Sequence, residues 1–193
     1  MALFMCNTSN VHEMKFGRPQ TVLVEGKDAL PNGVIVTLGG TKETADGKNR
    51  ELDHVHGITE GALTSVAGKF IVVAPEINAQ QYRKIDGQIG KFALEVGETY
   101  SAYQLSVLDR IEYSDAYFVA VPEVGNKVKV QAKDAKGARF VVDNAAGCLR
   151  VVSVVDLWMP IMLAANDGVA QVGGQDAKLM PATIKMIKVE VEK

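Results

Sequence analysis

The sequence KFIVVAP, residues 69–75, decides the fold class because it predicts a strand that is buried on both faces. Residues 70–73 form an unbroken run of amino acids that favour β-structure. Gly68 precedes this run and Pro75 closes it, so the run is too short and too firmly bounded for a helix. We therefore expect the rest of the chain to be arranged around a central strand. No stretch of the sequence contains a recognisable catalytic motif.

Further strands are expected on both sides of this segment, because short β-favouring runs alternate with turns. The clearest are residues 21–25, 34–38, 92–96, 99–108, 111–121, 127–132, 138–142, 149–155 and 184–191, with a weaker candidate at 51–58. Residues 21–25 and 34–38 are expected to form an antiparallel pair, with a turn at 30–33 before the second strand. Strict alternation in residues 127–132 places Val128 and Val130 inward.

One short helix is expected over residues 77–84, and residues 156–165 are either strand or a second brief helix after Pro160. The other connections are too short for the helices that a parallel sheet requires. The predicted fold class is therefore all-β: a sandwich or barrel of about ten short, mostly antiparallel strands with one or two short helices.

The length of 193 residues predicts one domain with appended segments. We expect an N-terminal arm over residues 1–17, a β-rich core over 18–145, and a C-terminal β extension over 146–193 packed on that core. The formal charge of −2 favours neither nucleic acid nor an anionic membrane surface, and no apolar run is long enough to span a membrane. Cys6 and Cys148 are expected to be free thiols, as in a protein made in the cytoplasm.

His54 and His56 are the strongest candidates for chemistry, since residues two apart on a strand share a face and could reach one metal ion. No third ligand lies at a suitable spacing, so an exposed polar strand is the simpler interpretation. Nucleophile and phosphate-binding motifs are also missing from the sequence. We expect no enzyme activity, no cofactor and no metal.

Three regions are candidate protein contacts. The hairpin at 127–139 carries five cations against one acid, a local charge of +4, and is a solvated sheet edge, a docking surface for an acidic protein or, least favoured, a contact for nucleic acid. The apolar N-terminal segment packs on a neighbouring chain or on its own core. The segment around Trp158 is either core or interface. The named candidates are Leu3, Phe4, Met5, Phe16, Lys129, Lys133, Lys136, Trp158 and Met159.

The order of several turn-and-strand segments resembles that of the small head proteins of tailed bacteriophages. The matching segments are Arg18-Pro19 with Val22, Val24 and Glu25, then residues 30–39, 70–76, 102–105, 109–114 and 124–128. Their order is similar over about residues 18–142, most of the chain, whereas the residues after about 145 extend beyond the pattern. The family is that of the decoration, or cement, proteins that accompany a major capsid protein.

This resemblance implies a β-rich protein that binds the outside of a capsid and stabilises the head. It implies the major capsid protein as partner, a location on the capsid exterior after assembly in the host cytoplasm, and no enzyme, cofactor or metal. A homo-oligomer, a dimer or trimer, fits this role. The alternative is a β-barrel module of a virion fibre that binds a carbohydrate or small molecule through Tyr100, Tyr103, Tyr113 and Tyr117.

Overall fold

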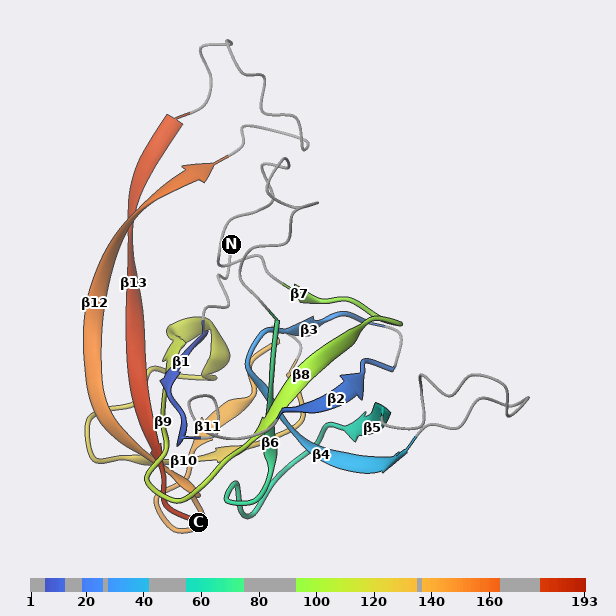
Figure 1. Ribbon diagram of the computed structural model, residues 1–193. Helices are drawn as coiled ribbons and strands as arrows, with labels where there is room; N and C mark the ends of the chain where they lie inside the picture. Colours follow the sequence, from blue (N-terminus) through green and yellow to red (C-terminus); the bar gives the residue numbers. More distant parts are fainter. Residues whose placement is uncertain are drawn as a thin grey trace.

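The computed structural model describes residues 6–12, 19–25, 28–41, 55–74, 93–134, 137–163 and 178–193, and only the backbone at 158–163 and 178–182. These residues form thirteen strands and the 3-10 helix η3 (Asp115–Tyr117) (Figure 1). The predicted all-β class is confirmed, with a closed barrel, a six-stranded sheet and a small two-stranded sheet. The helix expected over 77–84 lies outside the described residues.

The barrel closes in the order β2-β5-β4-β6-β8. Its strands are β2 (Gln20–Leu23), β4 (Val34–Thr41), β5 (Val55–Thr59), β6 (Phe70–Val73) and β8 (Thr99–Gln104). All neighbours are antiparallel except β2 and β5. Beside the barrel, β3 (Leu30–Pro31) pairs with β7 (Ala93–Leu94).

The central strand β6 is buried on both faces, as its sequence predicts. Ile71 packs in the core between the barrel and the six-stranded sheet, whereas Val72 packs in the core inside the barrel. Both side chains are fully buried. Because successive side chains of a strand point to opposite faces, one short apolar run serves two cores.

The six-stranded sheet is antiparallel throughout, in the order β1-β9-β13-β12-β10-β11. Its strands are β1 (Cys6–Asn10), β9 (Arg110–Ser114), β10 (Lys127–Val130), β11 (Phe140–Val142), β12 (Leu149–Leu163) and β13 (Lys178–Val191). Val128 and Val130 are buried as expected, and β10 and β11 form the predicted hairpin. The domain boundary expected at residue 145 falls between β11 and β12.

The expected pairing of residues 21–25 with 34–38 is wrong, because β5 lies between β2 and β4 in the barrel. A hairpin requires a short connection. Here the connection contains β3, which pairs with β7 instead. The barrel therefore closes through a parallel β2–β5 pair that connects residues distant in sequence.

The second brief helix considered within 156–165 is also wrong, because β12 continues as a strand to Leu163. Cross-strand pairs run from Asp156–Lys185 to Leu163–Lys178. These pairs give residues 156–163 a backbone partner, which outweighs the helical preference inferred from a short segment.

The expected strand over 111–121 ends at Ser114 and is followed by η3. In a straight strand, Tyr113 and Tyr117 would be about 13 Å apart at 3.3 Å per residue. The 3-10 turn brings their ring centroids to 4.8 Å. Both rings are fully buried, and burial raises the pKa of both hydroxyls well above the usual range.

These two tyrosines join the sheet to the barrel at the Asn32-Gly33 turn. The Tyr113 hydroxyl donates to the Gly33 carbonyl at 2.9 Å, and the Tyr117 hydroxyl donates to the Asn32 carbonyl. The Asn32 side chain accepts a hydrogen bond from the Ala74 N–H at 2.9 Å, which ties the turn to the end of β6. Gly33 has φ +82°, and a Cβ there would lie 2.3 Å from the Cys6 Sγ. The turn therefore requires glycine.

Candidate functional site

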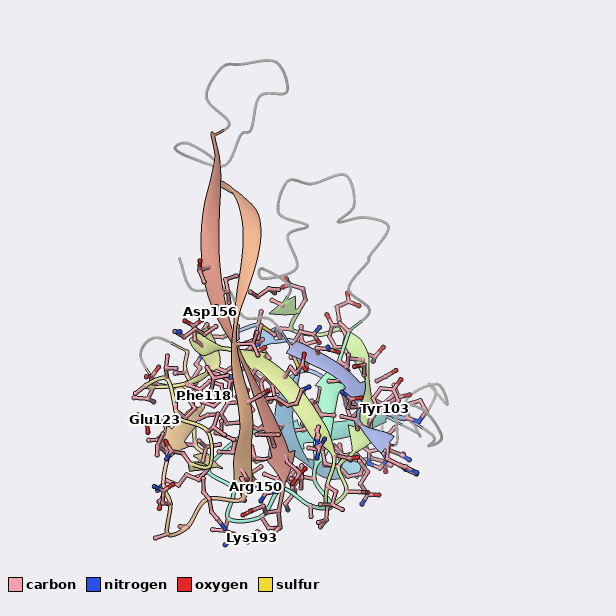
Figure 2. The ribbon with its side chains drawn as sticks, turned by 90° about the vertical axis from the view of Figure 1, so that its left-hand side faces the viewer. Tyr103, Phe118, Glu123, Arg150, Asp156 and Lys193 are labelled. Carbon is pink, nitrogen blue, oxygen red and sulfur yellow. The ribbon has the colours of Figure 1, made fainter. Side chains whose placement is uncertain are left out.

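A two-stranded projection, here called the arm, consists of residues 156–163 of β12 and 178–185 of β13. The pairs of β10 with β12 end at Arg150, and the pairs of β9 with β13 end at Met186. Beyond these points, β12 and β13 pair only with each other among the described residues. The two strands extend past the other strands of the sheet in both views (Figure 1, Figure 2).

An isolated two-stranded ribbon is marginally stable in water. The arm sequences, DLWMPIML and KLMPATIK, are nevertheless mostly apolar. Apolar composition in a projecting ribbon is typical of a segment that contacts another protein. The arm is therefore a candidate for binding another protein.

The cross-strand register divides the arm into two faces, since directly opposed residues share a face. A bulge between Val151 and Ser153 shifts this register by one residue. The face continuous with the solvent side of the sheet has the positions Leu157/Ile184, Met159/Ala182, Ile161/Met180 and Leu163/Lys178. The other face has the positions Asp156/Lys185, Trp158/Thr183, Pro160/Pro181 and Met162/Leu179.

At the base of the arm, β12 carries exposed apolar side chains. Val155 is 56% exposed and Leu157 38% exposed. On the opposite face, Asp156 and Lys185 form a solvated ion pair at 2.8 Å. An exposed pair of this kind contributes little to stability. The exposed Val155 and Leu157 side chains thus lie at the base of the arm, where Ile184, the cross-strand partner of Leu157, is buried.

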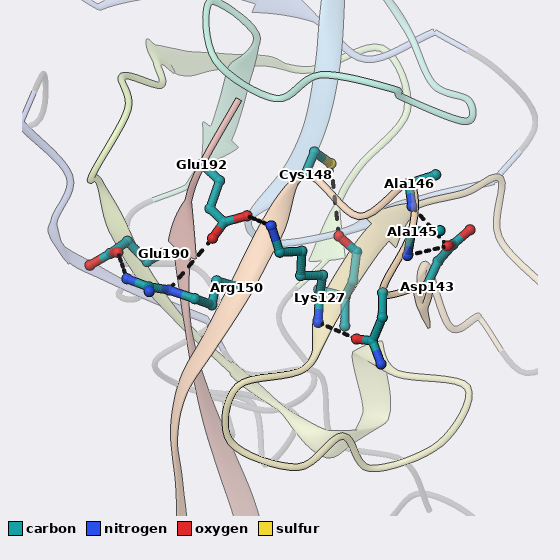
Figure 3. A network of polar contacts seen from close by, with 10 residues as sticks. Lys127, Asp143, Ala145, Ala146, Cys148, Arg150, Glu190 and Glu192 are labelled. Atoms are coloured by element: carbon teal, nitrogen blue, oxygen red, sulfur yellow. Dashed lines mark hydrogen bonds and ion pairs between the residues drawn. The ribbon is translucent and has the colours of Figure 1, made fainter.

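Near Leu149 of β12 and Val191 of β13, the solvent side of the sheet carries charged side chains that form ion pairs with one another (Figure 3). Glu190 bonds both Arg110 at 2.8 Å and Arg150 at 2.5 Å. These hydrogen bonds hold the pKa of the Glu190 carboxyl below its usual value. Lys127 pairs with Glu192 at 2.6 Å, which extends the network to β10. The network links four strands and leaves each of these charges with an opposite partner.

The described cations of the 127–139 hairpin also have acidic partners. Lys129 pairs with Asp143 at 2.8 Å, Lys133 pairs with Asp28 at 2.6 Å, and Arg139 pairs with Glu60. Hydrogen bonds from the two lysines lower the pKa of Asp143 and Asp28. Ion pairs within the chain thus offset the charges of the hairpin cations that the structure describes.

The other predicted contact residues are divided between the arm and undescribed segments. Trp158 and Met159 occupy adjacent arm positions on opposite faces of the ribbon. The remaining candidates, Leu3, Phe4, Met5, Phe16 and Lys136, lie outside the described residues. Sequence reasoning selected two arm positions but missed the ribbon, whose only local signal is a pair of apolar runs flanking a glycine-rich segment.

The histidine pair is described only in part. His56 lies on β5 with its Nδ1 3.3 Å from the Gly39 carbonyl oxygen, and His54 lies outside the described residues. Within the described ranges, no group of three or more His, Cys, Asp or Glu side chains is placed to hold a metal ion. Cys6 and Cys148 form no disulfide, as predicted, and burial raises the pKa of the Cys148 thiol.

Among the described residues, no helix has the length and apolar character needed to cross a membrane. No protein-family model, curated protein or solved structure matches the chain. The arm, the neutralised sheet surface and the closed barrel are therefore the observations on which a function must be based.

Proposed function

We propose that the chain is a virion structural protein, a capsid decoration protein that binds the lattice of the major capsid protein and stabilises the phage head. The observation that carries this proposal is the projecting arm, a two-stranded ribbon of mostly apolar sequence. The resemblance of residues 18–142 to phage decoration proteins supports the same role.

The rest of the molecule is suited to hold the arm in position. β12 and β13 continue from the arm into the sheet, where Val151, Ile187 and Val189 are buried in the core. The sheet is joined to the closed barrel by the Tyr113 and Tyr117 hydrogen bonds. A ribbon anchored in this way keeps its direction, which lowers the entropy lost when it binds.

The charge distribution favours a protein partner over nucleic acid. Nucleic-acid binding relies on cations that are available to neutralise phosphates. In the 127–139 hairpin, the described cations Lys127, Lys129, Lys133 and Arg139 are instead paired with carboxylates of the same chain. We propose a binding role without catalysis. A homo-oligomer on a repeating lattice would strengthen modest individual contacts through multivalency.

The test is removal of the arm without disturbing its base. Residues 158–183 are replaced by Asn-Gly, which joins Leu157 to Ile184; these two residues face each other across the strands, and the buried Ile184 is kept. Binding to isolated phage heads is then measured by co-sedimentation over a range of protein concentrations. We expect at least a 100-fold loss of affinity, because the deletion removes the proposed interface.

The matched control is Lys133→Ala, which removes a cation whose partner is the exposed carboxylate of Asp28 on the same chain. It should bind heads as tightly as the unmodified protein. Circular dichroism and thermal unfolding must show that the arm-deleted variant keeps its fold. Unchanged binding by a folded arm-deleted variant would refute the proposal.

A further inference from the structure

Two prolines face each other across the arm. Pro160 of β12 and Pro181 of β13 are directly paired in the register. Proline has no N–H to donate, so a proline in a strand is tolerated only where its missing donor does not face a neighbouring strand. The effect of the two prolines on strand pairing therefore depends on whether their backbone nitrogens point between β12 and β13 or away from the ribbon.

Hydrogen bonds near the C-terminal end of β13 establish that direction. The Val191 N–H donates to the Asp109 carbonyl at 2.9 Å, and the Val191 carbonyl accepts from the Leu108 N–H at 2.9 Å. The backbone groups of Val191 thus point away from β12. The direction of the backbone N–H and C=O groups alternates from residue to residue along a strand. The register shift between β12 and β13 is an extra residue on β12, so this alternation is unbroken along β13 from 178 to 191. Pro181, ten residues from Val191, therefore faces outward.

Pro160 faces outward as well, because directly opposed residues in an antiparallel pair have the same hydrogen-bonding state. The ladder between β12 and β13 consequently loses no hydrogen bond. Instead, each outer edge of the arm lacks one N–H, and the two gaps lie at the same level. A strand approaching either edge would meet a missing donor and a proline ring.

Building on the proposed function, we propose that the arm docks by its faces in an apolar cleft of the partner protein, and that Pro160 and Pro181 prevent strand addition along its edges. The composition of the faces agrees with this mode. From Trp158 to Leu163 and from Lys178 to Thr183, all residues but Lys178 and Thr183 are apolar. Both faces of the outer arm are thus mostly apolar in composition.

Estimates of buried area favour a cleft over a flat surface. Eight residues at about 3.3 Å each make the arm roughly 26 Å long, and two strands about 4.8 Å apart make it roughly 10 Å wide. One face therefore covers roughly 260 Å². Stable interfaces bury about 800 Å² on each partner. An arm surrounded on both faces and edges, with sheet layers about 10 Å thick, reaches roughly 1,000 Å².

The edge function is tested on the full chain with Pro160→Val combined with Pro181→Val, which restores the outward donors. The matched control is Met159→Val with Ala182→Val. This neighbouring pair gains the same β-branched residues, but its N–H groups point between the strands. Sedimentation velocity should show at least tenfold stronger self-association for the proline variant and none beyond wild type for the control. Equal behaviour of the two variants would overturn the edge function.

The docking mode is tested on isolated phage heads at protein concentrations below the onset of self-association. Ile161→Asp with Met180→Asp places two charges on one face of the arm and should lose at least tenfold in affinity, whereas Lys133→Ala, whose partner is Asp28 of the same chain, should bind like wild type. Wild-type binding by the aspartate variant when arm deletion abolishes binding would contradict docking by faces. If arm deletion has no effect, the proposed function itself fails.

Discussion

The barrel and the arm are both β-structures rich in apolar residues, but their strands differ in whether both edges are paired with a neighbouring strand. In the barrel, each strand has two neighbours, so closure leaves no free edge. In the arm, each described strand has one neighbour, and outward-facing prolines interrupt both edges. The comparison indicates two ways to prevent unwanted strand pairing: closure of the sheet in the barrel, and outward-facing prolines in the projecting ribbon.

The two regions should differ most in their response to loss of an apolar side chain. Ile71→Ala removes a fully buried side chain from β6 and should lower the free energy of unfolding by about 4 kcal/mol. Leu157→Ala removes a side chain that is 38% exposed at the base of the arm and should cost about 0.5 kcal/mol or less. Urea denaturation of both variants measures the difference. Similar losses would show that the arm belongs to the cooperative core.

A second comparison is between the arm and the Asn32-Gly33 turn, the joint between the barrel and the six-stranded sheet. Gly33→Ala adds a Cβ near Cys6 at a residue with positive φ. The left-handed conformation costs roughly 1–2 kcal/mol and overpacking adds roughly 1–3, so we expect a loss of about 3 kcal/mol. Thermal unfolding of this variant and of the arm-deleted variant should show a large decrease only for the first. A small decrease for Gly33→Ala would mean that the joint can relax.

Acid should affect the charged half of the sheet before the apolar arm. The pKa of Glu190 is below its ordinary value of 4.5, so its ion pairs contribute stability above that pH and lose it as the pH falls through the folded-state pKa. Glu190→Gln should therefore be less stable at pH 7 and show a shallower loss of stability below pH 4.5. Urea denaturation at a series of pH values measures this slope. Identical slopes would assign the acid response to other carboxylates.

The smallest expected effect concerns an exposed apolar residue outside the arm. Leu108 has φ +74° and is 70% exposed, a conformation that asparagine tolerates better. Leu108→Asn should raise the free energy of unfolding by about 0.5–1 kcal/mol, since asparagine relieves part of the roughly 1–2 kcal/mol of left-handed strain. It should bind heads like wild type if docking is confined to the arm. Weaker binding would show that this turn is also part of the interface.

Local patterns were sufficient for several features of this protein. The bounded run at 70–73 predicted a strand buried on both faces, the alternation at 127–130 predicted which valines are inward, and Asn32-Gly33 predicted a turn. Each depends on propensities and steric limits of a few adjacent residues, which the surroundings do not reverse. For the same reason the all-β class could be inferred from the sequence alone.

The tertiary structure alone decided which strands pair and which charges remain available. It placed β5 between β2 and β4, extended β12 through Pro160, and paired Lys133 with Asp28, 105 residues away in the chain. Strand pairing and ion pairing depend on groups that folding brings together from distant parts of the sequence, so a short window of residues does not contain them. The arm is the result of such pairing, and so the candidate binding site became visible only in the folded chain.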